Sequence, residues 1–218
     1  MSDKFLKHAY SLENAKATEA FYRDWAKSYD EDIIENGYET PRRCAEALAR
    51  FADDFTAPLL DIGCGTGLSG MAFAANGFTN QYGNDLCQDM ITIAKDRDIY
   101  KDIQLVDLNN PLDFKKGHYR YIAAVGVVAV GHAPASTIKD VISKLDEGGL
   151  FVFSLNDPTL KDGSYEPVID EAIAADEVTL LSCEYGTHLP KFGMKSKVFV
   201  LQKKSQPEYR AGSWNIDR

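Results

Sequence analysis

The sequence predicts an α/β protein of the Rossmann-like, doubly wound class, with a mostly parallel seven-stranded sheet closed by an antiparallel C-terminal hairpin. Three features indicate this class. Beyond Pro58, short apolar runs alternate with helical stretches, a glycine-rich turn follows the first run, and no helix separates the last two runs. Such alternation produces right-handed crossovers and a parallel sheet that helices cover on both faces. At 218 residues the chain has the length of one domain.

Residues 1–54 are expected to form an N-terminal helical cover that belongs to the same domain. Helix-forming residues with interleaved aromatics fill positions 13–34, and Asn36-Gly37 is a typical stop. A second helix is predicted to follow Thr40 as its N-cap, because the fixed φ of Pro41 suits the first helical position.

Residues 55–204 are expected to form the core, in which strands and helices alternate. The run 121–130 is apolar at almost every position, which is typical of a strand buried on both faces, so it is predicted to mark the middle of the sheet. The predicted elements are, in order, residues 59–62, 68–75, 81–84, 88–95, 103–106, 121–130, 137–145 and 150–155.

The end of the chain is predicted to close the sheet. After a helix around residues 167–175, the runs 178–183 and 197–202 indicate two strands joined by a loop with Gly186, Pro190 and Gly193. They should pair antiparallel, because a parallel connection needs a crossover that is usually helical. Residues 205–218 form a polar tail, either loose or anchored through Trp214.

Composition limits the partners and the compartment. A formal net charge of −9 opposes binding to polyanions, so no nucleic-acid partner is expected. No stretch is apolar enough to span a membrane and the N-terminus lacks the apolar core of a signal peptide, which predicts a cytoplasmic protein without a membrane partner. The irregular spacing of the four cysteines favours free thiols over a metal site. Nothing in the sequence determines the oligomeric state.

The glycine-rich turn predicts a ligand site. Gly63, Gly65 and Gly67 follow a predicted strand and precede a helix, and glycine lets the backbone approach a ligand that a Cβ would exclude. Residues 65–70 also satisfy the G-x-G-x-x-G string of dinucleotide enzymes. Asp61 argues against a dinucleotide, because its carboxylate would repel a pyrophosphate. It suits a ligand with an ammonium and a sulfonium, whose amino group it would hold directly or through the loop that it braces.

Residues 61–67, which read Asp-Ile-Gly-Cys-Gly-Thr-Gly, resemble the first motif of class I S-adenosylmethionine-dependent methyltransferases, D-x-G-x-G-x-G. The resemblance covers residues 21–203 and implies S-adenosylmethionine as the cofactor. Within the class, strings such as 25–30, 131–134 and 153–157 are similar to the Williams–Beuren-region methyltransferase-like group, which implies no particular substrate. Arg120 is a departure, since the class often has an acid there after an aromatic residue.

The resemblance also implies which residues bind the cofactor. Asp85, at the end of the second strand, would chelate two ribose hydroxyls, although such an aspartate can simply cap a helix. Leu86 and Met90 would pack on the adenine or in the core, and Asp107 would accept from the adenine amino group or occupy a solvated turn. The implied set is Tyr29, Asp61, Gly63, Cys64, Gly65, Gly67, Asp85, Leu86, Met90, Asp107, Leu108, Val125 and Gly126.

The N-terminal aromatics have two interpretations. Tyr22 and Trp25 have the spacing of an ordinary buried stripe on a helix. Tyr29 stands in a Tyr-Asp pair that matches the family, and it is the candidate for a lid residue that faces the cofactor. His188, in the predicted hairpin loop, is placed where it could reach the mouth of the site.

The acceptor side of the site is predicted at the carboxyl edge of the sheet, where ligands bind in open α/β folds. His132, Asn156 and Asp157 follow the fourth and fifth predicted strands, and the N-P-P-Y type tetrapeptide of many exocyclic-amine methyltransferases is absent. His132 is the candidate catalytic base, needed only if the acceptor must lose a proton; otherwise it shapes the turn.

The predicted function is methyl transfer to a small-molecule acceptor by in-line displacement. Two alternatives come from other classes. The chain could be a non-catalytic S-adenosylmethionine-binding partner or regulatory protein, or an NAD-dependent oxidoreductase. Asp61 and the lack of a second catalytic domain disfavour the oxidoreductase.

Overall fold

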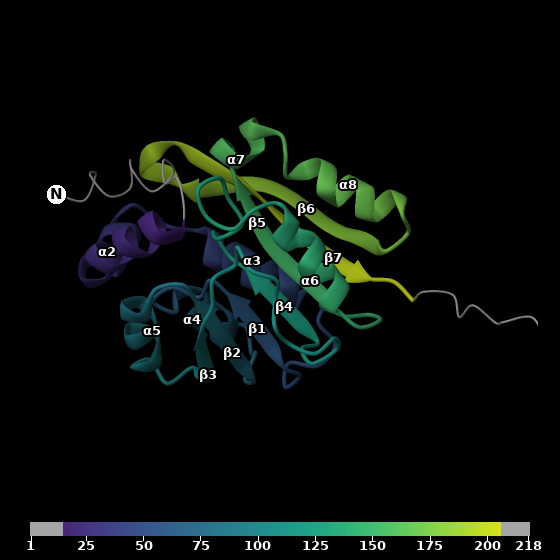
Figure 1. Ribbon diagram of the computed structural model, residues 1–218, viewed down its shortest axis with the longest axis horizontal. Coiled ribbons are helices and arrows are strands. Elements are labelled where there is room, and N and C mark those ends of the chain that lie inside the picture. Colours follow the sequence, from purple (N-terminus) through teal and green to yellow (C-terminus); the bar gives the residue numbers. More distant parts are fainter. Residues whose placement is uncertain (1–14, 206–218) are drawn as a thin grey trace, which may run out of the picture.

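In the computed structural model, which describes residues 15–205, seven strands form one sheet with helices on both faces (Figure 1). The strand order is β3-β2-β1-β4-β5-β7-β6. Strands β1 to β5 pair in parallel, and β7 runs antiparallel between β5 and β6. The predicted fold class is thereby confirmed. The strands are β1 (Leu59–Ile62), β2 (Gln81–Asp85), β3 (Tyr100–Leu105), β4 (Tyr121–Ala124), β5 (Leu150–Asn156), β6 (Val178–Leu189) and β7 (Met194–Lys203).

The helices divide into two layers and a cover. Helices α3 and α4 bury Leu48 and Phe73 against one face of the sheet, and α6 and α8 bury Ile138 and Ile169 against the other. Helix α2 packs beside α5 and at the tip of the β6–β7 hairpin (Figure 1). The helices are α2 (Ala15–Glu35), α3 (Thr40–Ala49), α4 (Leu68–Ala75), α5 (Gln88–Lys95), α6 (Ser136–Lys144), α7 (Asp157–Asp162), α8 (Glu166–Ala174) and the 3-10 turn η1 (Pro190–Phe192). No described helix is both long and apolar enough to cross a bilayer.

The central strand is shorter than predicted. β4 ends at Ala124 because Gly126 turns the backbone with a φ of 72°. Val128 and Ala129 are nevertheless buried, in a loop closed by a hydrogen bond from the Ala133 amide to the Val127 carbonyl at 3.0 Å. The apolar run 121–130 therefore predicts the burial of Val128 and Ala129 correctly, but these residues are buried in a loop and not in a strand.

The closing hairpin is longer than predicted. β6 continues through Leu189, and the chain turns at η1 and Gly193 rather than in a loop from residue 184 onward. The sequence assigns residues 184–187, including Gly186, to the loop because a solvent-exposed edge strand shows no continuous apolar run. The hairpin tip reaches α2, where Leu189 is buried with Trp25 (Figure 1).

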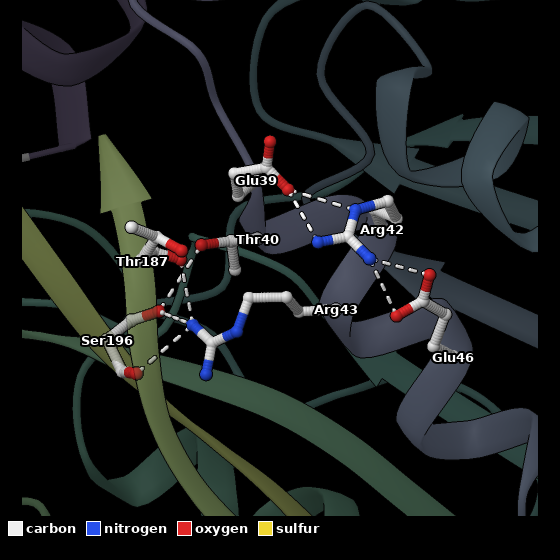
Figure 2. A network of polar contacts seen from close by, with 7 residues as sticks. All are labelled: Glu39, Thr40, Arg42, Arg43, Glu46, Thr187 and Ser196. Atoms are coloured by element: carbon white, nitrogen blue, oxygen red, sulfur yellow. Dashed lines mark hydrogen bonds and ion pairs between the residues drawn. The ribbon is translucent and has the colours of Figure 1, made fainter. Parts of the chain in front are cut away.

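Thr40 does not cap α3 as predicted. Glu39 occupies the N-cap without a side-chain hydrogen bond to the helix backbone. The Thr40 hydroxyl lies 2.7 Å from His188 Nδ1 and 3.3 Å from Ser196 Oγ. Figure 2 shows Arg43, one turn further along α3, reaching toward Thr187 and Ser196 of the hairpin. Helix α3 is thus fixed to the hairpin by polar contacts.

His188 does not reach the mouth of the site, contrary to the prediction. Its side chain is 3% exposed, and burial lowers the pKa of its imidazole to about 4. Its role is to link α3 and β6 as a neutral side chain. The predicted C-terminal tail, including the Trp214 anchor, lies outside the described residues except for Ser205.

Candidate active site

A cavity of about 740 Å³, including its open mouth, lies where β1, β2 and β4 end. Helix α2 forms one wall, and the loops after the parallel strands form the other. Asp61, Cys64 and Gly67 do not line it, whereas His132 does. The remaining predicted cofactor residues all line it: Tyr29, Gly63, Gly65, Asp85, Leu86, Met90, Asp107, Leu108, Val125 and Gly126.

The three glycines of the turn each adopt a left-handed backbone. Their φ values are 65° for Gly63, 55° for Gly65 and 91° for Gly67, which is the N-cap of α4. A Cβ on Gly63 would lie 2.4 Å from Val127 Cγ2, whereas a Cβ on Gly65 would meet no protein atom within 4 Å. Gly65 therefore leaves open space in the cavity wall, where a ligand can approach the backbone.

Asp85 holds the base of the cavity together. Its Oδ2 accepts from the Gly65 amide at 2.9 Å, and its Oδ1 accepts from the Cys87 amide at 2.8 Å. Burial raises the pKa of this carboxyl, although the backbone donors oppose that effect. Asp85 does not cap α5, whose N-cap is Cys87. Because each carboxylate oxygen accepts more than one hydrogen bond, the observed bonds to the two amides and a ribose-binding role are compatible.

Asp61 braces the glycine turn from behind. Its side chain is 0% exposed, and its Oδ2 accepts from Ser69 Oγ at 2.5 Å and from the Tyr100 hydroxyl at 2.7 Å. Its Oδ1 is buried, and no donor among the described residues reaches it. Burial raises the pKa of the Asp61 carboxyl to about 7. Asp61 is expected from the sequence either to hold the ligand's amino group directly or to brace the loop that does. The contacts to Ser69 and Tyr100 are those of the bracing role.

The ionisation of Asp61 should make the ligand-free protein less stable as pH rises. The folded carboxyl has a pKa of about 7, above that of an unfolded aspartate, so the stabilisation is complete below pH ~4 and is lost as pH approaches ~7. The expected loss in the free energy of unfolding is about 4 kcal/mol over the whole range, of which about 3 kcal/mol falls between pH 5 and pH 8. Urea unfolding at pH 5 and pH 8 should show this smaller loss in the wild type and not in Asp61→Asn. Parallel pH profiles of the two proteins would contradict this assignment.

Helix α2 is attached to both ends of the cavity. At one end, Thr18 Oγ1 donates to the Gly131 carbonyl at 3.1 Å and the Tyr22 hydroxyl lies 2.7 Å from His132 Nε2. At the other end, Asp30 accepts from Thr66 Oγ1 at 2.5 Å and forms an ion pair with Arg97. The helix therefore spans the cavity.

The aromatic residues of α2 divide between the cavity and the core. Tyr22 and Tyr29 line the cavity. Trp25 is 1% exposed, with its indole donating to Asp32 at 2.8 Å, so it belongs to the buried stripe. Sequence reasoning missed Thr18, and it also missed Tyr38, which lines the cavity from the segment between α2 and α3.

Binding of S-adenosylhomocysteine is expected to slow amide hydrogen exchange in residues 21–29, because this part of α2 covers the cavity. Helix α8, on the far side of the sheet, provides the internal control. Equal exchange in α2 with and without the ligand would mean that the helix is ordinary core packing and not a lid.

On the predicted adenine side, Asp107 is part of a turn. Its Oδ1 accepts from the amide and the side-chain nitrogen of Asn109, at 2.9 and 2.8 Å, and Asn109 itself lines the cavity. Cys64 points elsewhere: its side chain is buried with Ile91 and Ile103. Cys64 is thus a residue of the loop framework, and Asn109 is a cavity residue that the sequence did not suggest.

Of the predicted acceptor-side residues, His132 alone lines the cavity. Asn156 caps α7 by accepting from the Thr159 amide at 3.1 Å. Asp157 accepts from the Tyr185 hydroxyl at 2.7 Å and the Lys195 amide at 2.8 Å. The expected convergence of all three residues is wrong, because Asn156, the last residue of β5, caps α7 and Asp157, the first residue of α7, is bonded to the β6–β7 hairpin.

Comparisons with known proteins identify the family. A family model described as a methyltransferase domain matches residues 37–196. Human Methyltransferase-like protein 27 is 30% identical over 124 residues, which are 56% of this chain and 51% of that protein. The 18S rRNA (guanine-N(7))-methyltransferase RID2 of Arabidopsis thaliana is 34% identical over 102 residues, which are 45% of this chain and 35% of that protein. The match thus spans about half or less of the length of these relatives.

Among solved structures, magnesium protoporphyrin IX methyltransferase from Synechocystis PCC 6803 with bound S-adenosylmethionine has a similar fold. The TM-score is 0.66 at 15% identity, and the match covers 88% of this chain and 98% of that one.

The prediction that nucleic acid is excluded as a partner is wrong. A relative at 34% identity is an rRNA methyltransferase. The net charge of −9 is a sum over the whole chain and does not describe the charge at one edge of the sheet.

The matched domain, the order of the sheet and the glycine turn all indicate the same family. The chain therefore belongs to the methyltransferase domain family and, within it, to the class I S-adenosylmethionine-dependent methyltransferases.

Proposed function

We propose that this domain transfers the methyl group of S-adenosylmethionine to a small acceptor that enters beside Tyr22 and His132. One observation carries the proposal. A single cavity is lined by Gly65 and Asp85 at the end of β1 and β2, and by Tyr22 and His132 next to it. Methyl transfer needs the two reactants held in one enclosed space, because orientation supplies about 7–11 kcal/mol of the rate enhancement.

The residues present fit the cofactor. Asp85 would accept from two ribose hydroxyls, Leu86 and Met90 would pack on the adenine, and Gly65 would let the cofactor approach the backbone. The buried Oδ1 of Asp61 is an acceptor without a described donor, which suits an ammonium held through the loop or through water. When bound, S-adenosylmethionine supplies a methyl group already activated by its sulfonium.

The lining of the cavity limits the acceptor. Among the lining residues that the structure describes, Asp85 and Asp107 are the charged side chains, and none is a lysine or arginine. Burial lowers the pKa of His132, so its imidazole is neutral near pH 7. A carboxylate or phosphate at the reacting position would therefore lack a cationic side chain as a partner. The lining favours an uncharged acceptor group of small size.

An RNA acceptor is the second candidate, and the rRNA methyltransferase among the relatives is the observation that favours it. To separate the two, purified protein is incubated with methyl-labelled S-adenosylmethionine and either a small-molecule fraction or a ribosomal RNA fraction of cells. Asp85→Ala serves as the blank. Label is expected in the small-molecule fraction.

The other outcomes have definite meanings. Label in RNA would contradict the small acceptor. Tight binding of S-adenosylhomocysteine without label in either fraction would favour the non-catalytic binding protein.

A further inference from the structure

We infer that Tyr22 is the group that takes the acceptor's proton and that His132 lies behind it as the second proton acceptor, so that the acceptor is a hydroxyl. This inference rests on the proposed function and narrows its substrate class. It differs from the prediction that His132 meets the acceptor directly. The evidence is the hydrogen bonding of the two side chains.

The position of the imidazole proton follows from the surroundings of His132. Its Nδ1 lies 3.3 Å from the Val130 carbonyl, which can only accept a hydrogen bond, so Nδ1 carries the proton of the neutral ring. Nε2 is then an acceptor. The Tyr22 hydroxyl, 2.7 Å away, donates to it.

This arrangement places Tyr22 between His132 and the acceptor. Both ring nitrogens of His132 have protein partners, so a substrate hydroxyl would have to displace Tyr22 to bond to Nε2. The phenolic oxygen that donates its proton keeps two lone pairs that can accept one. A substrate hydroxyl that donates to Tyr22 therefore leaves the contact between Tyr22 and His132 in place.

Packing fixes the hydroxyl of Tyr22 in place. Its ring lies edge to face with His132, at 5.6 Å between ring centroids, and stacks on Trp25 at 5.9 Å. One turn earlier on α2, Thr18 Oγ1 donates to Gly131, the residue before His132. The two side chains are thus held by contacts on both sides of their hydrogen bond.

The proton transfer balances without a further reactant. The substrate proton passes to the Tyr22 oxygen while the Tyr22 proton passes to His132 Nε2. The substrate oxygen bonds to the methyl carbon as the carbon–sulfur bond breaks. The positive charge of the sulfonium ends on the imidazolium of His132. A neutral amine needs no such base before attack, so the pair is suited to a hydroxyl.

The first test locates the proton. Nitrogen-15 spectra of the histidines are recorded at pH 7 with S-adenosylhomocysteine bound, and His132→Ala assigns the signals. We expect a neutral His132 with its proton on Nδ1 and an Nε2 resonance that shifts in Tyr22→Phe. Tyr185→Phe, which removes a tyrosine hydroxyl outside the cavity, should leave it unchanged. A proton on Nε2, or no response to Tyr22→Phe, would overturn the inference.

The second test uses the acceptor found in the labelling screen. Tyr22→Phe keeps the ring and its packing, and it should lower kcat about 10²–10⁴-fold with unchanged affinity for S-adenosylhomocysteine. Adding His132→Ala should cost little more, because the two residues act as one unit. The inference would be overturned if Tyr22→Phe kept the full kcat, or if the losses in kcat of the two single variants added in the double variant. Methylation of an amine nitrogen would also overturn it. If the screen finds no acceptor, the proposed function fails, and the spectra still decide whether the pair can move a proton.

Discussion

Replacing His132 with alanine is expected to lower turnover about 10²–10⁴-fold and to leave the affinity for S-adenosylhomocysteine nearly unchanged. His132 lines the cavity and is hydrogen-bonded to Tyr22, and in the proposed mechanism its imidazole is the final proton acceptor. Initial rates with the identified acceptor and calorimetry with S-adenosylhomocysteine measure the two effects separately.

His118→Ala is the matched control for this variant, because His118 is exposed in the segment between β3 and β4. It should have wild-type rates. Full activity of His132→Ala would remove His132 from the mechanism. A loss of S-adenosylhomocysteine binding would instead assign it the structural role of shaping the turn.

Asp85→Ala is expected to weaken S-adenosylmethionine and S-adenosylhomocysteine binding by about 2–3 kcal/mol, or roughly 30–150-fold. The change removes the proposed acceptors for two ribose hydroxyls, and it also releases the Gly65 amide. Calorimetry with both ligands measures it. Asp89→Ala removes an exposed carboxylate from the first turn of α5 and should bind both ligands as the wild type does. Equal affinities of Asp85→Ala and wild type would show that Asp85 does not bind ribose.

The class of the sheet, parallel strands closed by an antiparallel hairpin, could be predicted because it depends on patterns that burial imposes along the chain. Alternating apolar runs and helices specify parallel pairing, and two adjacent runs without a helix specify the antiparallel β6 and β7. The ligand turn could be predicted for a similar reason. Gly63, Gly65 and Gly67 all have positive φ, which residues other than glycine rarely adopt. The three glycines in the sequence therefore predict the conformation of this turn.

The acceptor side could not be predicted to the same degree, because its contacts join distant positions. Tyr22 has the spacing of a core residue, and its hydrogen bond to His132 crosses 110 positions of sequence. Asn156 and Asp157 stand at the correct edge of the sheet. Asn156 is held by a local bond to Thr159 at the start of α7, whereas Asp157 is held by Tyr185, 28 positions away in sequence. Likewise, Thr40 is predicted to be an N-cap because Pro41 follows it. Its bond to His188, 148 positions away, leaves no pattern in the local sequence.

The attachment of α2 at both ends of the cavity has a thermodynamic consequence. Asp30 and Tyr22 are eight residues apart on one helix, about 12 Å along its axis, and they contact the glycine turn and His132 respectively. If cofactor occupancy draws Asp30 onto the turn, it also sets Tyr22 against His132. Linkage then requires reciprocity: the factor by which the cofactor raises acceptor affinity equals the factor by which the acceptor raises cofactor affinity. The helix would thus make the two bindings cooperative within a single domain.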